Sequence, residues 1–240
     1  MTKIPFVGES AFSNAALKRH KDYCRQLGVP RIGGELVSEN LAIVGGGYTA
    51  AHVVQEIKDF DGEVWAVNGA FDWCKTNGIN PTFFAIDPSD EIAEYCHNVD
   101  RAIVSDIIHQ ETFKALEGCH VEYDALGPSW GTSAVSAAPI IAAKRGHKNL
   151  TFFGCPMSFI GDTHLYMNEQ WSRVWVDCGG KEYVTSPQLI MQVEHLAGIA
   201  RLAPNFITVV GEGFLPALIE HGDYDVTHTT RDIADTLKAA

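Results

Sequence analysis

Short apolar runs and helical segments alternate along this chain of 240 residues, and the alternation restricts the fold more than any other feature. The apolar runs fall at residues 41–44, 63–67, 82–86, 102–104, 121–123, 150–153 and 206–210. The helical patterns occupy residues 50–59, 89–96, 110–116, 133–144, 186–201 and 213–220. Strands that alternate with helices pair in parallel through right-handed crossovers. The sequence therefore predicts an α/β fold with a doubly wound and mainly parallel sheet.

One segment breaks the alternation. Residues 173–177 and 181–185 have strand character and flank the pair Gly179 and Gly180. Two glycines between such runs are typical of a tight hairpin turn. We therefore expect an inserted β-hairpin near residues 172–185.

The amino-terminal part of the chain differs from the rest. Residues 11–27 have helical spacing and basic character, and a link that contains Gly and Pro follows at residues 28–34. We expect an N-terminal helical extension over residues 1–40, followed by a single Rossmann-like domain over residues 41–240.

The charge balance restricts the partners. Eighteen basic and thirty acidic side chains give a formal net charge of -12, which opposes the counterion release that drives nucleic-acid binding. We therefore expect a small-molecule substrate, no nucleic acid and no membrane, while a homo-oligomer stays open. A phosphate site in such a chain needs backbone dipoles, a few local Arg and Lys, or a divalent cation.

The six cysteines form no C-x-x-C pair and no metal-ligand spacing. No apolar run has the length of a signal peptide core or a membrane span. The simplest interpretation is a thiol-reduced, cytoplasmic protein.

The first strand ends at three consecutive glycines, Gly45, Gly46 and Gly47, and Thr49 follows at the start of a helical pattern. Glycines allow close backbone approach to a ligand, and a helix N-terminus offers amide groups to an anion. This turn predicts a phosphate or nucleotide site, and the alternative is an ordinary strand-to-helix turn.

Polar residues also follow the next two strands. Asn68 follows the second strand and could hydrogen-bond a base or ribose, or serve as a turn or helix-cap residue. Asp87 follows the third strand beside Asp90 and Glu91. Hard oxygen ligands suit Mg²⁺ held with substrate phosphates, and capping of the next helix is an equally strong alternative for Asp87.

Further candidates lie toward the carboxyl half. Thr132 and Ser133 open a helix, where their hydroxyl and amide groups can cap the helix or bind an anion. Asp162 and His164 lie on a polar loop and are candidates for general acid/base catalysis or metal binding, with an ordinary surface loop as the alternative.

Together these motifs resemble the 6-hydroxymethylpterin diphosphokinase MptE-like family, which is Rossmann-like. The resemblance covers most of the chain from residue 41 onward, through residues 43–47, 66–70, 77–82, 85–87, 131–134, 145–146, 150–154 and 183–186. The same order of motifs is similar to small bacterial sialyltransferases that use a nucleotide-activated sugar.

The resemblance implies a nucleotide-binding transferase. Gly45 to Gly47, Asn68, Thr132 and Ser133 would contact the nucleotide, and Asp87 would lie near the phosphates. Our leading hypothesis is pyrophosphoryl transfer from ATP with Mg²⁺ to a small hydroxymethyl acceptor, with Asp87 holding the metal. The alternatives are a glycosyltransferase that uses a nucleotide sugar, with His164 as base, and a Rossmann-like module that binds a ligand without catalysis.

Overall fold

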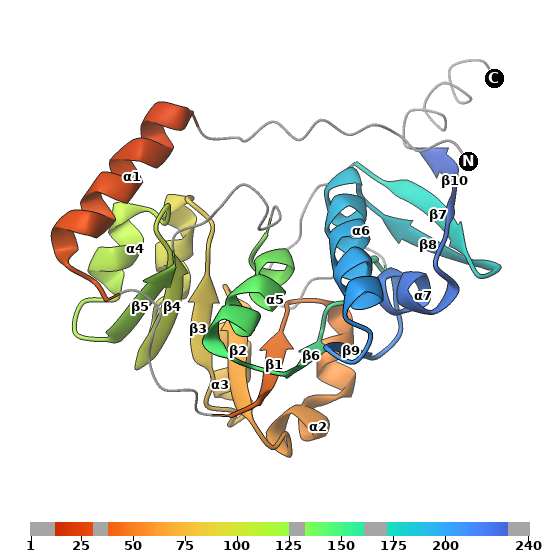
Figure 1. Ribbon diagram of the computed structural model, residues 1–240, viewed down its shortest axis with the longest axis horizontal. Helices are drawn as coiled ribbons and strands as arrows, with labels where there is room; N and C mark the ends of the chain where they lie inside the picture. Colours follow the sequence, from red (N-terminus) through yellow and green to blue (C-terminus); the bar gives the residue numbers. More distant parts are fainter. Residues whose placement is uncertain (1–12, 31–37, 125–132, 161–171, 230–240) are drawn as a thin grey trace.

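A computed structural model describes residues 13–30, 38–124, 133–160 and 172–229 of the chain. Its centre is a seven-stranded sheet with the order β5-β4-β3-β2-β1-β6-β9, and every neighbouring pair is parallel (Figure 1). The strands are β1 (Asn40–Val44), β2 (Glu63–Val67), β3 (Thr82–Ala85), β4 (Arg101–Ser105), β5 (His120–Asp124), β6 (Asn149–Phe153) and β9 (Ile207–Val210). The predicted α/β fold with a doubly wound parallel sheet is confirmed.

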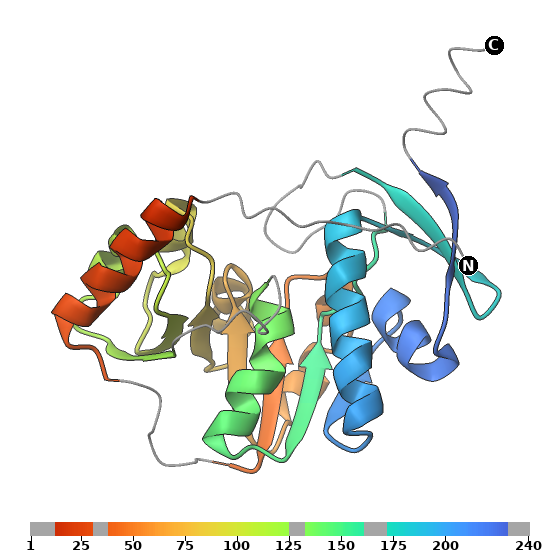
Figure 2. The same cartoon turned by 45° about the horizontal axis from the view of Figure 1, so that its top comes forward.

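Helices cover both faces of the sheet, because side chains of successive strand residues point to opposite faces. Leu41 and Ile43 of β1 pack in one core cluster, and Ala42 and Val44 pack in the other. The first cluster includes α5 (Ala134–Arg145), α6 (Pro187–Leu202) and α7 (Phe214–His221). The second includes α1 (Asn14–Leu27), α2 (Val54–Lys58), α3 (Ala70–Thr76), η2 (Asp90–Tyr95) and α4 (Gln110–Ala115). Figure 2 shows α5 and α6 side by side in front of the sheet.

A small antiparallel sheet lies beside α6 and α7 (Figure 1). It contains the predicted hairpin, now seen as β7 (Val174–Cys178) and β8 (Lys181–Thr185), and a third strand, β10 (Asp225–Thr229), which pairs with β7. Gly179 and Gly180 have φ values of 66° and 78°, as a tight hairpin turn requires.

Several expected helices differ from the structure. The expected helix at residues 50–59 is a 3-10 helix, η1 (Tyr48–His52), followed by the five-residue α2, because Val53 has non-helical backbone angles between them. The segment expected at residues 89–96 is also 3-10 helical. Helix α3 and strand β10 were not predicted.

The amino-terminal helix α1 packs against α4, where the rings of Tyr23 and Phe113 lie 6.2 Å apart. The segment that follows α1 runs beside the edge strand β5, and the amide of Tyr123 donates a 3.0 Å hydrogen bond to the carbonyl of Pro30. The division of the chain at residue 40 stays a prediction. No helix in the described parts of the chain is long and apolar enough to cross a bilayer.

Candidate functional site

The strand order reverses at β1, which lies between β2 and β6. From β1 the chain builds toward β5 on one side, and then returns to add β6 and β9 on the other. In open parallel sheets, ligands bind outside the carboxyl ends of the strands at such a switch point. The loops after β1, β2, β6 and β9 therefore define the candidate site.

The glycine turn after β1 packs directly against the turn after β6. The amides of Gly45 and Gly47 donate hydrogen bonds of 2.9 and 2.8 Å to the carbonyls of Phe153 and Gly154. A methyl group on Gly45 would lie 2.6 Å from Cys155 Sγ. This packing explains why Gly45 and Gly47 are glycines, and it commits both of their amides to the protein. Gly46 is buried between them.

Thr49, in the helix after the glycine turn, is 4% exposed. Its Oγ1 atom is buried and makes no hydrogen bond within the described parts of the chain. The residue lies against the loop after β9, since a methyl group on Gly211 would be 3.3 Å from Thr49 Cβ. Burial of a hydroxyl group without a hydrogen-bond partner lowers the stability of the fold, so such a group is unusual in a native protein.

Asn68 follows β2 and adopts a left-handed backbone conformation, with φ of 47°. Its amide donates to the carbonyl of Phe84 at 3.1 Å, and its carbonyl accepts from the amide of Phe71 at 3.0 Å. The side-chain Oδ1 is buried, and no described residue satisfies it. Thr49 and Asn68 thus present two unsatisfied oxygens after adjacent strands.

Asp87 is exposed after β3, and its Oδ1 accepts a 2.9 Å hydrogen bond from the amide of Ser89. Ser89 in turn caps the next helix through the amide of Glu91. The cap of this helix is therefore Ser89, and Asp87 holds the amide of that cap residue. Among the residues that the structure describes, no group of three or more His, Cys, Asp or Glu side chains could hold a metal ion. The role of Asp87 toward Mg²⁺ stays a prediction.

Ser133 caps α5. Its hydroxyl accepts from the amide of Ser136, and the Ser136 hydroxyl accepts from the amide of Ser133, which completes a capping box. The Ser133 hydroxyl also donates to Oε1 of Gln192 at 2.8 Å, which links α5 to α6. The other predicted residues, Thr132, Asp162 and His164, lie outside the described residues.

The structure brings four further side chains to this edge that the sequence did not single out. Tyr48 opens η1, and Glu212 lies between β9 and α7. Lys181 and Tyr183 come from β8, and Lys181 Nζ lies 2.9 Å from Glu212 Oε2. Burial raises the pKa of the Tyr183 hydroxyl, and the nearby Lys181 opposes that shift. The Gly-Glu-Gly turn after the last strand of the large sheet is the sequence signal that could have indicated this part of the site.

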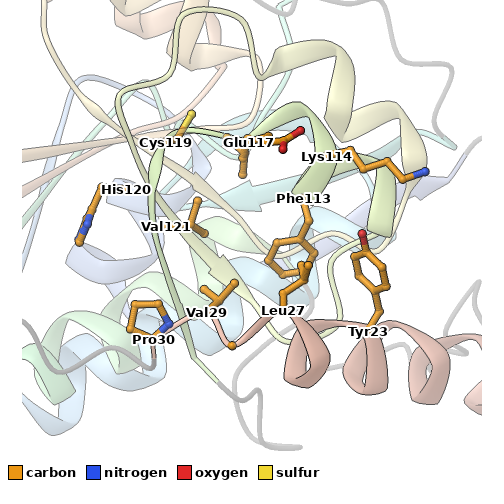
Figure 3. Close-up of a pocket in the computed structure, with 12 residues that line it drawn as sticks. Tyr23, Leu27, Val29, Pro30, Phe113, Lys114, Glu117, Cys119, His120 and Val121 are labelled. Atoms are coloured by element: carbon orange, nitrogen blue, oxygen red, sulfur yellow. The ribbon is translucent and has the colours of Figure 1, made fainter.

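An open pocket of about 510 Å³ lies elsewhere, between α1, α4 and the start of β5 (Figure 3). Leu27, Val29 and Phe113 give it an apolar wall, while Lys114 and Glu117 lie at its side. None of the predicted site residues that the structure describes lines it.

Comparison with known proteins gives a likeness in structure. No family model matches the chain, and no curated protein matches it. A solved structure of the MAf glycosyltransferase from Magnetospirillum magneticum AMB-1 superposes with a TM-score of 0.58 at 13% identity. The match covers 93% of this chain and 41% of that one, so this chain spans about two fifths of the neighbour. The likeness establishes a shared fold, and membership of the MptE-like family is not shown.

Proposed function

We propose that this protein is a glycosyltransferase that uses a nucleotide-activated sugar. The observation that carries the proposal is a pair of buried oxygens at the switch point of the sheet, Thr49 Oγ1 and Asn68 Oδ1, which no described residue satisfies. Buried polar groups in native proteins are usually satisfied. Ribose hydroxyls and the amino or imino groups of a base are donors that would satisfy these two oxygens.

The fold of the MAf glycosyltransferase favours sugar transfer over the diphosphokinase reaction. This reaction class needs a nucleotide site, an acceptor hydroxyl and a base. The hydroxyl oxygen would form a bond to the anomeric carbon as the bond from that carbon to the nucleotide phosphate breaks. His164 is the proposed base that takes the hydroxyl proton, and Asp162 is proposed to assist in this acid/base step.

Nucleotide binding by the purified chain tests the proposal. A thermal shift series would compare CMP, CDP and UDP with ATP, each with and without Mg²⁺. We expect a cytidine or uridine nucleotide to stabilise the fold most. Asn68→Ala should lower the affinity for that nucleotide by about tenfold, because it removes a desolvated hydrogen bond.

Asn98 provides the matched control for Asn68. It also has positive φ, at 56°, but it is exposed outside the candidate site. Asn98→Ala therefore introduces similar backbone strain and should leave nucleotide affinity unchanged. Equal loss of affinity in both variants would contradict the assigned role of Asn68.

The other two hypotheses give different results in the same series. Best stabilisation by ATP with Mg²⁺, lost in Asp87→Ala, would favour pyrophosphoryl transfer. Nucleotide binding without turnover of any sugar donor, by hydrolysis or transfer, would favour a binding module without catalysis. His164→Asn should abolish turnover and leave nucleotide affinity near that of the wild type.

A further inference from the structure

The β7–β8 hairpin reaches the carboxyl edge of the large sheet through one ion pair. Lys181 is the first residue of β8, and its Nζ lies 2.9 Å from Oε2 of Glu212. The same Nζ lies 5.5 Å from the centroid of the Tyr183 ring. A lysine from the small sheet is therefore held over the loop that follows β9.

This loop adjoins the candidate nucleotide site. Gly211, the residue before Glu212, packs against Thr49, whose hydroxyl is buried and has no partner in the described parts of the chain. The lysine thus pairs with the residue that follows Gly211, and Gly211 packs against Thr49 in the helix after the glycine turn.

The opposite end of β8 is fixed to the loop after β6. Thr185 Oγ1 donates a 2.8 Å hydrogen bond to the carbonyl of Met157, and Thr185 is fully buried. The amide of Phe159 donates to the carbonyl of Val184 at 2.7 Å. The strand that carries Lys181 is therefore anchored, and rearrangement at the edge requires only the lysine side chain to move.

The Lys181–Glu212 pair is highly exposed, with 58% and 84% of the two side chains accessible. Exposed ion pairs contribute little stability. A phosphate carries more charge than one carboxylate and offers more acceptor oxygens, so it makes stronger charge-assisted hydrogen bonds. An arriving phosphate can therefore take the place of Glu212.

We propose that Lys181 binds a phosphate of the nucleotide donor, and that Glu212 forms the ion pair with Lys181 when the donor is absent. This inference rests on the proposed function, because it assigns a residue to the same nucleotide site. It also supplies a local cation for an anionic ligand on a chain with a net charge of -12. Glu212 is then a competitor built into the protein, and it sets the affinity and salt dependence of donor binding.

The two halves of the pair have opposite predicted effects on binding. Titration calorimetry on the full chain would use UDP, CMP and inorganic pyrophosphate at low and physiological salt. Lys181→Gln should raise the Kd about tenfold at low salt, and less at high salt, since phosphate contacts are screened. Glu212→Gln should lower the Kd about threefold, because it removes a competing charge.

Lys114 and Glu111 provide a matched control pair. Their side chains are also exposed, and Lys114 Nζ lies 2.7 Å from Glu111 Oε1 on α4. Lys114→Gln and Glu111→Gln remove the same charges and should leave every Kd unchanged. Urea denaturation of all four variants would verify that folding is intact.

The outcomes separate this inference from the proposed function. If the wild type binds UDP or CMP and Lys181→Gln does not change the Kd, the inference fails while the proposed function stands. If Glu212→Gln weakens binding as Lys181→Gln does, the pair is structural and the inference also fails. If the wild type binds pyrophosphate through Lys181 but no nucleotide, the proposed function fails and the anion site stands. Binding of none of the three ligands overturns both.

Discussion

Nη1 of Arg145 lies 2.7 Å from Oε2 of Glu122, and only 1% and 5% of these two side chains are exposed. Burial raises the pKa of Glu122, but the guanidinium groups of Arg145 and Arg101 and a hydrogen bond with His120 bring it below its usual value. The pair joins the end of α5 to the strand β5.

Removal of Arg145 should leave the buried Glu122 carboxylate with only the partly exposed Arg101 as a close guanidinium partner. We expect Arg145→Met to lower the free energy of unfolding by about 3–5 kcal/mol, and Arg145→Met with Glu122→Leu to recover most of that loss. Urea denaturation measures both. Lys148 and Glu39 form an exposed pair, so Lys148→Met should change stability by less than about 1 kcal/mol. A loss from Lys148→Met equal to that from Arg145→Met would contradict the role of burial.

His147 should make stability depend on pH. Burial, and to a smaller extent Arg145, lower its pKa below the ordinary value of 6.5, although Glu63 and the carbonyl of Ser38 oppose the shift. Between the folded pKa and about 6.5, the unfolded chain binds more protons, so the free energy of unfolding rises with pH. The stabilisation is complete above about pH 6.5 and is lost as the pH falls through the folded pKa.

Urea denaturation between pH 5 and 7.5 would measure this dependence. His147→Asn should flatten the curve in that window, while replacement of the exposed His52 by Asn should leave it unchanged. His195 has a pKa lowered by burial, so part of the slope should remain in His147→Asn. An unchanged slope in His147→Asn would exclude His147 as the source.

The glycine turn should tolerate no side chain at Gly47. A methyl group there would lie 2.3 Å from Pro156 Cδ and 2.7 Å from the carbonyl oxygen of Gly154. We expect Gly47→Ala to lower the free energy of unfolding by about 1–3 kcal/mol, as for other overpacked sites. Gly198, in α6, has no neighbouring atom within 4 Å of an added methyl group, so Gly198→Ala should gain about 0.5–1 kcal/mol. Thermal or urea denaturation that gave the opposite order would contradict the close packing of the two turns.

Thr49→Val should separate stability from binding. It removes a buried hydroxyl that is unsatisfied within the described residues, so we expect a gain of about 1 kcal/mol in the free energy of unfolding and weaker nucleotide binding. Thr112, in α4, is fully buried away from the candidate site. Its hydroxyl also has no hydrogen-bond partner among the described residues. Thr112→Val should therefore gain similar stability with unchanged nucleotide affinity. Calorimetric titration of both variants tests this, and equal affinities would exclude a ligand contact at Thr49.

The strands of the large sheet could be predicted because both of their faces are buried. Their apolar runs are therefore nearly continuous in the sequence. The glycine pair at the hairpin predicts its turn equally well. Strand β10 has a polar sequence, Asp225–Thr229, and takes its structure from pairing with β7. Helix α3 carries Phe71 and Trp73, which are weak helix formers, and it is held by tertiary packing.

The candidate site could be predicted only in part. The chain order of strand ends located Gly45, Asn68 and Asp87 at one edge of the sheet. It could not show that the turn after β6, more than 100 residues later, accepts the amides of the glycine turn. Nor could it show that the hairpin brings Lys181 to Glu212, because that contact depends on how a second sheet packs.

The hydrogen bond from the amide of Tyr123 to the carbonyl of Pro30 limits how two copies of this protein can pair through the exposed edge of the large sheet. An edge strand exposes unpaired amides and carbonyls that can pair with another chain. At this position on β5, the amide of Tyr123 is already occupied. Proline has no amide hydrogen to offer a further strand. The segment that follows α1 therefore blocks strand addition at this point, which protects this side of the sheet from edge-to-edge aggregation.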